Sequence, residues 1–224
     1  MKYKLSLITF LMLTATNLKS QDISKLPLTA KAKSTAKQVI FYLSGDGGLN
    51  SFSESLTTSL NDKNYAVVSL DSRKYFWEQK SPEKLTQDLS AAIEYYLKAW
   101  DKDEFAIIGY SFGADAALFL SHRLSKDLQV KLKATILLSP STSTDLVIKL
   151  TDMMGFGNKE AKYKLVPEIS KINSPLLFIF GKNEESDLYK LIPEKKNITK
   201  TQIPGSHKFD NDIKKVVATI QTAL

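Results

Sequence analysis

Residues 109–113 of the sequence read Gly-Tyr-Ser-Phe-Gly, which is the pattern Gly-x-Ser-x-Gly. An apolar run at 105–109 precedes the serine, and a helix-forming run at 114–118 follows it. A serine at a sharp strand-to-helix turn is exposed as a nucleophile, and small residues two positions before and after it avoid clashes with neighbouring backbone. The pattern alone also arises by chance, whereas the strand before it and the helix after it are independent requirements. We therefore predict that Ser111 is a nucleophile.

A serine nucleophile needs a base within hydrogen-bonding reach, and the sequence contains two histidines. His122 lies on the same predicted helix as Ser111, about 16 Å further along its axis, which excludes it as the base. We expect His122 to lie on the helix surface near the C-terminus, where a positive charge is favourable. His207 follows the last predicted strand in a turn, which is where the base of such a site is found, and we predict that it is the base.

The third member of such a site is a carboxylate that orients the histidine and lies between the serine and the histidine in chain order. Acidic residues follow the strand predicted at 176–180 within the next turn. In order of preference they are Glu184, Glu185 and Asp187. Asp145, which follows an earlier strand, is a weaker candidate.

A tetrahedral intermediate needs two preorganised N–H donors for its oxyanion. One is normally the amide after the nucleophile, here that of Phe112, and the other comes from a loop after an early strand. Residues 44–48 read Ser-Gly-Asp-Gly-Gly and follow the strand predicted at 39–43. The glycines allow the backbone to turn an amide toward the site, so we predict Asp46 or Gly47 as the second donor. The loop lacks the glycine patterns of nucleotide-binding loops, so we do not expect nucleotide binding.

These residues must be positioned by a sheet with covering helices. From residue 38 onward, apolar β-rich runs alternate with helical patterns, which is typical of the α/β class: a mostly parallel central sheet with helices on both faces. Strands are predicted at 39–43, 65–70, 105–109, 134–139, 176–180 and 197–203. Helices are predicted at 51–62, 82–100, 112–124 and 209–223. Glycines and a proline interrupt residues 141–174, which we expect to form a cap or lid over the sheet edge.

The first 37 residues do not show the alternating strand and helix patterns of the rest of the chain. Lys2 and Lys4 precede an apolar run at 5–13, and we interpret residues 1–20 as a secretory signal peptide, whose apolar part is too short for a transmembrane anchor. Residues 21–37 are polar and lysine-rich, and we expect a loose basic lead-in or linker. Residues 38–224 are then one domain, because a chain of this length favours a single α/β unit.

The composition excludes several kinds of chemistry. The 224 residues include no cysteine and only two histidines, so disulfides, thiol nucleophiles and thiolate metal sites are absent, and we expect neither a metal nor another cofactor. The formal net charge is +7, and it is +4 without residues 1–20. No nucleic-acid-binding motif accompanies this charge, so we expect no nucleic-acid partner. The charge is compatible with peripheral contact with an anionic membrane surface.

Three longer stretches resemble the bacterial VirJ/AcvB family. They are Ser-Gly-Asp-Gly-Gly at 44–48, Asp-Ser-Arg-Lys-Tyr-Phe-Trp at 71–77 and Gly-Tyr-Ser-Phe-Gly-Ala-Asp at 109–115. The resemblance covers essentially all of the chain after the predicted signal peptide. It implies an α/β-hydrolase that is periplasmic or secreted, with Ser111 as nucleophile and His207 as base. AcvB-type members imply hydrolysis of lysyl-phosphatidylglycerol, the aminoacyl ester of a membrane lipid, and VirJ-type members imply an association with type IV secretion proteins and virulence.

The sequence departs from this family pattern in places that concern the substrate. Leu49 stands where a tryptophan is expected after the double glycine, and Ser206 and Lys208 flank the histidine in place of a glycine and a second histidine. These differences affect the shape of the pocket more than the type of reaction. Two other functions therefore remain open: a generic exported esterase or peptidase, and a non-catalytic partner in secretion.

Two further features of the motifs carry hypotheses. Tyr75 and Trp77, with Asp46, could line a pocket for a lysyl ammonium group through cation–π and charge contacts, whereas Phe76 is expected in the core. Asp115, in the first turn of the helix after the nucleophile, is expected to pin that turn to a neighbouring loop.

Overall fold

The structure is a computed structural model, which describes residues 22–149 and 161–224. Its main sheet has the strand order β1-β3-β2-β4-β5-β8-β9, in which β1 is antiparallel to its neighbour and the other strands are parallel. The strands are β1 (Leu28–Lys31), β2 (Gln38–Leu43), β3 (Ala66–Leu70), β4 (Glu104–Tyr110), β5 (Leu132–Leu138), β8 (Leu176–Gly181) and β9 (Ile198–Ile203).

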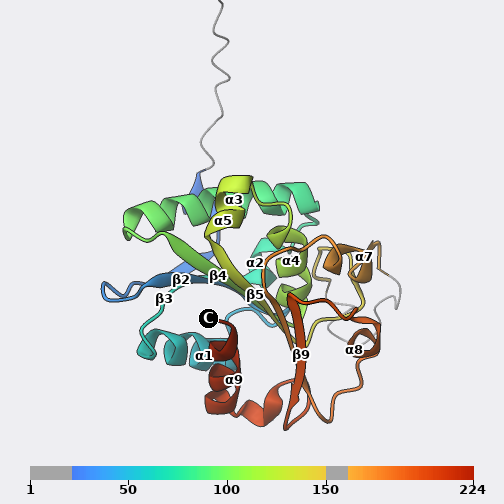
Figure 1. Cartoon of the computed structure of the whole chain (residues 1–224). Helices are drawn as coiled ribbons and strands as arrows, with labels where there is room; N and C mark the ends of the chain where they lie inside the picture. The colour runs from blue at the N-terminus through green and yellow to red at the C-terminus, as the bar shows by residue number, and fades with distance from the viewer. Residues whose placement is uncertain (1–21, 150–160) are drawn as a thin grey trace, which may run out of the picture.

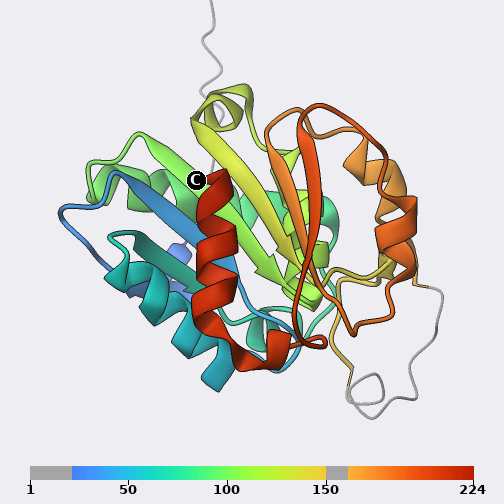
Figure 2. The same ribbon diagram turned by 60° about the horizontal axis from the view of Figure 1, so that its bottom comes forward.

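Helices cover both faces of this sheet (Figure 1). They are α1 (Ser51–Asp62), α2 (Ser72–Tyr75), α3 (Pro82–Ala99), α4 (Phe112–Ser121), α5 (Lys126–Lys131), α7 (Val166–Ile169), α8 (Asp187–Leu191) and α9 (Ile213–Ile220). α1 and α9 pack side by side on one face (Figure 2), and α3 and α4 lie on the other. The helix predicted at 209–223 is divided, because short 3-10 turns at Phe209–Asn211 and Gln221–Ala223 flank α9.

The strands are apolar throughout because both of their faces are covered. In β2, Phe41 and Leu43 pack in the core beneath α3 and α4, while the alternate residues Ile40 and Tyr42 pack in the core beneath α1 and α9. A strand buried on both faces is a continuous apolar run rather than an alternating one. The prediction of an α/β fold with helices on both faces is confirmed.

The region expected to be a loose lead-in contributes a strand. Leu28–Lys31 pairs antiparallel with β3, with Leu28 opposite Leu70. The Lys31 ammonium donates to Thr58 Oγ1 at 2.7 Å and to Glu54 at 3.2 Å, which fastens this edge of the sheet to α1. The expectation is therefore wrong for these four residues. A short, half-exposed edge strand buries too little apolar surface to produce a readable pattern.

Two regions singled out from the sequence are only partly described. The predicted signal peptide, residues 1–20, lies outside the described residues. In the predicted cap at 141–174, the described residues form a small antiparallel pair, β6 (Ser143–Thr144) with β7 (Tyr163–Lys164), and α7, which pack against α4. Within 22–149 and 161–224, no helix is long and apolar enough to cross a membrane.

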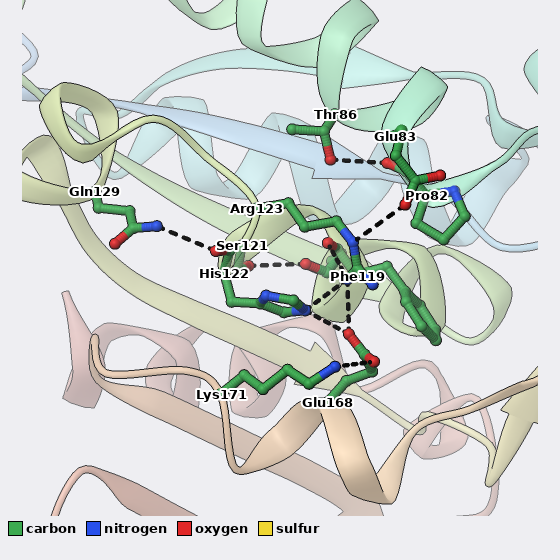
Figure 3. Close-up of polar contacts among 11 residues, drawn as sticks. Pro82, Glu83, Thr86, Phe119, Ser121, His122, Arg123, Gln129, Glu168 and Lys171 are labelled. Carbon is green, nitrogen blue, oxygen red and sulfur yellow. Dashed lines mark hydrogen bonds and ion pairs between the residues drawn. The ribbon is translucent and has the colours of Figure 1, made fainter.

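A cluster of charged side chains ties the C-terminal end of α4 to α7 (Figure 3). Glu168 accepts hydrogen bonds from Arg123 at 2.6 Å and from Lys171 at 2.8 Å, and it contacts His122 Nε2. His122 is thus not the exposed, positively charged residue that we expected. Its ring is mostly buried, and burial, together with the positive charge of Arg123, lowers its pKa despite the contact with Glu168.

The pKa of Glu168 leads to a testable pH dependence. Burial alone would raise this pKa, but hydrogen bonds from Lys171, Arg123 and His122 outweigh it and lower the pKa from 4.5 to about 2. A lowered carboxylate pKa contributes stability that is present above pH 4.5 and is lost as the pH falls toward 2. We expect Glu168→Gln to lower the free energy of unfolding by about 2 kcal/mol at pH 7 and by less than half as much at pH 3. Urea unfolding of both proteins measures this, and an equal loss at both pH values would contradict the ionic role.

Candidate active site

The backbone around Ser111 forms a tight turn between β4 and α4. Ser111 has φ 52° and ψ −122°, a conformation that is strained for a residue with a side chain. A Cβ on Gly109 would lie 2.3 Å from the carbonyl oxygen of Gly113, and a Cβ on Gly113 would lie 2.2 Å from that of Leu43. Both positions therefore require glycine. The Gly-x-Ser-x-Gly pattern thus has the structural context that the sequence analysis required.

Side chains from three strand ends meet at the C-terminal edge of the sheet. Ser111 follows β4, Glu184 follows β8 and His207 follows β9. His207 Nε2 lies 2.9 Å from Ser111 Oγ, and His207 Nδ1 lies 2.6 Å from Glu184 Oε1. An ionised carboxylate only accepts hydrogen bonds, so Nδ1 carries the proton and Nε2 is left to accept from the serine hydroxyl. The arrangement can activate Ser111 as a nucleophile.

Glu184 is held by a set of donors that keeps it ionised. Its Oε2 accepts from Ser139 Oγ at 2.7 Å and from the amide of Gly181 at 3.3 Å. Burial alone would raise the pKa of Glu184, but the hydrogen bonds from His207 and Ser139 outweigh it and lower the pKa. A negative charge at Glu184 stabilises the imidazolium that forms when His207 takes a proton.

The other acidic candidates lie away from the histidine. Glu185 and Asp187 are exposed, and Asp187 forms an ion pair of 3.8 Å with Lys190. Asp145 accepts from the amide of Lys162 at 2.7 Å. Of the acids proposed from the sequence, Glu184 is therefore the one that the structure places on His207.

The predicted oxyanion donors lie on either side of the nucleophile. Phe112 is the first residue of α4, so its amide has no acceptor within the helix. Gly45 faces Ser111, since a Cβ on Gly45 would lie 3.4 Å from Ser111 Cβ. Asp46 and Gly47 follow directly, and within the described part of the chain their amides and that of Phe112 donate no hydrogen bond. These amides are available to a negatively charged oxygen.

Two residues that support the histidine, Ser139 and Tyr110, were not predicted from the sequence. Ser139 has φ 50°, and this left-handed backbone aims its hydroxyl at Glu184. The Tyr110 ring lies against His207 with centroids 5.5 Å apart, and its hydroxyl donates to the His207 carbonyl at 3.4 Å. The only signal for Ser139 was a polar residue at the end of an apolar strand. Tyr110 occupies the first variable position of the Gly-x-Ser-x-Gly pattern, and because any residue fits there, the pattern gave no reason to single it out.

The role of Ser139 can be tested by Ser139→Ala. Loss of its hydrogen bond raises the pKa of Glu184, because that bond is one of those that lower it. We expect kcat for the reaction at Ser111 to fall about tenfold, since hydrogen bonds to charged groups are among the stronger ones. The acid limb of the pH–rate profile should also move to higher pH. A merely structural role would lower activity without moving that limb.

Asp115 anchors the nucleophile turn as expected. Its carboxylate accepts from the amide of Ser141 at 2.8 Å and from the Ser141 hydroxyl at 2.6 Å, which connects α4 to the loop after β5. Burial raises the pKa of Asp115 to about 7, against the opposing effects of Ser141 and of the charge of His207. Asp115 thus has a structural part in the site.

The predicted ammonium pocket is wrong in its composition. Tyr75 is buried, and its hydroxyl donates to Asp88 at 2.7 Å, so it is not part of the lining that contains Trp77, and neither is Asp46. Trp77 is 54% exposed and lines a cavity of about 560 Å³ that also contains two cationic side chains, Arg73 and Lys74. Phe76 is fully buried, as expected. Adjacent aromatic residues in a sequence do not indicate which of them faces outward.

The fold and the site geometry define an α/β-hydrolase-fold protein. Solved structures similar to the chain include Est1E from Butyrivibrio proteoclasticus with ferulic acid bound (16% identity, TM-score 0.65, covering 90% of this chain and 96% of that one). Another is proline iminopeptidase from Mycobacterium smegmatis (11% identity, TM-score 0.64, covering 87% of this chain and 92% of that one). A third is a lipase-esterase related protein from Clostridium acetobutylicum ATCC 824 (15% identity, TM-score 0.62, covering 89% of this chain and 99% of that one). At sequence identities of 11–16%, the structural similarity to these proteins establishes the fold of the chain and not its activity.

The chain belongs to the family described as bacterial virulence protein (VirJ), whose pattern it matches over residues 37–224. None of the curated proteins compared with the chain matches it. Within the part of the chain that the structure describes, no group of three or more histidine, aspartate and glutamate side chains could hold a metal ion.

Proposed function

We propose that the chain is a serine hydrolase that cleaves ester bonds, with Ser111 as nucleophile, His207 as base and Glu184 as the acid that orients it. The observation that carries this proposal is the continuous hydrogen-bonded series from Glu184 through His207 to Ser111, with separations of 2.6 and 2.9 Å. It is supported by amides on both sides of the nucleophile that donate no hydrogen bond within the described residues, and by structural neighbours named as a lipase-esterase related protein and a proline iminopeptidase.

The reaction follows from these positions. Ser111 Oγ attacks the ester carbonyl carbon while His207 Nε2 accepts the hydroxyl proton. The amide of Phe112, with that of Asp46 or Gly47, stabilises the oxyanion. The imidazolium returns the proton to the alcohol oxygen as the carbon–oxygen bond breaks, which leaves an acyl ester on the serine. Water then attacks this ester and gives a proton to Nε2. As the bond between the acyl carbon and Ser111 Oγ breaks, Nε2 returns the proton to Oγ, which releases the acid and restores the serine hydroxyl.

We further propose that the ester is the lysyl ester of phosphatidylglycerol, that the protein is exported, and that it acts at an anionic membrane surface. Membership of the VirJ family and the motifs that resemble AcvB-type members support the substrate. The apolar run within residues 1–20 supports export, and the charge of +4 after their removal supports contact with an anionic surface. Proteins of a secretion system are further possible partners on the same resemblance.

The substrate can be tested with two ester substrates in parallel. Residues 21–224 are incubated with vesicles that contain lysyl-phosphatidylglycerol, and free lysine is measured; a p-nitrophenyl ester is tested alongside. We expect both to be cleaved. Cleavage of the p-nitrophenyl ester without release of lysine would leave an esterase and remove the lipid assignment. Cleavage of neither would contradict the hydrolase proposal and favour a non-catalytic partner in secretion.

A further inference from the structure

A pocket of about 560 Å³ lies beside the candidate oxyanion loop. It begins at Gly47 and Gly48, close to Gly45, which faces Ser111. A substrate whose ester carbon is at Ser111 can therefore extend into it. The lining residues are Gly47, Gly48, Leu49, Asn50, Asp71, Arg73, Lys74 and Trp77. We refer to this cavity as the Arg73 pocket.

The charges in the Arg73 pocket favour an anion. Lys74 Nζ lies 3.4 Å from Asp71 Oδ2, so the one carboxylate of the lining already has a cationic partner. Within residues 22–149 and 161–224, the guanidinium of Arg73 forms no hydrogen bond or ion pair, and the side chain is exposed. The lining thus has an excess of one positive charge, carried by Arg73. An ammonium group would be repelled here, and an anionic group would be attracted.

The backbone holds the stem of Arg73 beside the loop. A Cβ on Gly48 would lie 3.3 Å from Arg73 Cβ, so the two segments are in close contact. The amides of Gly48 and Asn50 donate to carbonyl oxygens of the same loop, at 3.0 and 2.9 Å. Gly48 and Asn50 therefore offer no free amide to a ligand. The main polar group left for recognition beside them is the planar fork of the Arg73 guanidinium, which matches two oxygens of a phosphate group.

The remaining lining is apolar. Trp77 is 54% exposed, an unusually open position for a tryptophan, and Leu49 is only partly buried. Apolar surfaces of this kind contact the carbon atoms of a ligand, whereas the anionic group of the same ligand binds to a charged side chain. Together, one unpaired guanidinium and an apolar wall indicate a ligand with a phosphate group attached to a carbon skeleton.

We propose that the Arg73 pocket binds a phosphate group in the alcohol part of the ester substrate, with Arg73 as the main contact. This inference rests on the proposed function, because it takes Ser111 as the nucleophile that the bound substrate approaches. It makes Arg73 a specificity-determining residue and adds a requirement that an ester hydrolase as such does not have: an anionic alcohol. The phosphate can belong to a lipid headgroup or to a soluble phosphate ester.

The test compares two soluble esters with the same acyl group, lysylglycerol and lysylglycerol phosphate, in the unmodified protein and in Arg73→Gln. We expect the unmodified protein to favour the phosphate ester in kcat/KM by at least about tenfold, and Arg73→Gln to remove most of that preference. Lys131→Gln, at the opposite edge of the sheet, is the matched loss of one exposed positive charge and should leave the preference unchanged. An equal preference in Arg73→Gln and the unmodified protein would overturn the proposal.

Two further arms separate the remaining outcomes. If lysyl-phosphatidylglycerol in vesicles is cleaved faster than the soluble phosphate ester, with the same dependence on Arg73, the phosphate belongs to a lipid headgroup. If the soluble phosphate ester is cleaved faster, the phosphate belongs to a soluble ester. If the unmodified protein cleaves no ester, the proposed function fails, and calorimetric binding of glycerol 3-phosphate still tests the pocket. At least about tenfold weaker binding by Arg73→Gln would support it. Equal binding by the two proteins, or no binding, would overturn it.

Discussion

Replacing Ser111 by alanine is expected to reduce hydrolysis of both a p-nitrophenyl ester and the lysyl lipid by at least about a thousandfold. The alanine removes the oxygen atom that is proposed to form the acyl ester, while His207 and Glu184 keep their mutual hydrogen bond. Among the residues that the structure describes, Ser111 Oγ is the hydroxyl that contacts His207 Nε2. Initial rates of p-nitrophenol and lysine release measure the loss directly.

A matched control separates this effect from the loss of any serine hydroxyl. Ser125 caps α5 by accepting from the amide of Leu128 at 3.3 Å, and α5 leads into the opposite edge of the sheet. Ser125→Ala should therefore lower stability slightly and leave the ester rates unchanged. Retention of most activity by Ser111→Ala, with the fold intact by circular dichroism, would show that another group performs the reaction.

The second large effect concerns stability and falls on Gly113. Replacing it by alanine would place a Cβ 2.2 Å from the carbonyl oxygen of Leu43 and 2.3 Å from that of Ser44. These are backbone atoms of a central strand end, so they cannot move away without disturbing the sheet. We expect Gly113→Ala to lower the free energy of unfolding by at least about 3 kcal/mol, measured by urea unfolding.

Gly47→Ala is the appropriate comparison for this substitution. There the nearest atom to the added Cβ is the side-chain amide nitrogen of Asn50 at 2.8 Å, which is the end of a flexible side chain. We expect a loss below about 1 kcal/mol. Similar small losses for both variants would contradict the tight packing of the nucleophile turn against the loop after β2.

Much of the sheet could be predicted from the sequence because its strands are buried on both faces. A run such as 176–180 has no polar residue, and a short apolar run between turn residues fits a central parallel strand. The helix at 51–62 was also predictable, since Asn50 caps it and its apolar residues recur at helical spacing. β1 could not be predicted in this way, because its pairing with β3 depends on a distant partner.

The candidate site was predictable where chain order and elimination limit the choices. The strand–turn–helix context indicated Ser111 as the nucleophile, and of the two histidines only His207 was placed to act as its base. Glu184 was the first acidic residue after the strand predicted at 176–180. Residues that act through tertiary contacts had no such pattern. Ser139 reaches Glu184 only because of a left-handed backbone at the end of β5, and a sequence does not show which strand ends become neighbours.

The pocket chemistry was the least predictable feature. Aromatic residues at 75–77 suggested a site for a cation, yet Tyr75 turns inward to Asp88 and Phe76 is buried. The two basic residues before them, Arg73 and Lys74, instead face the cavity. Side-chain direction within a short helical turn is set by what packs beneath it, and that information is tertiary.

Covalent labelling with a fluorophosphonate tests the central claim most directly, because the reagent reacts with an activated serine and leaves a mass that can be assigned to one peptide. We expect a single adduct on Ser111, absent in Ser111→Ala and formed much more slowly in His207→Ala, which retains the serine but lacks its base. Absence of labelling in the unmodified protein, an adduct on another serine, or equal labelling rates with and without His207 would contradict the role of Ser111 as a nucleophile activated by His207.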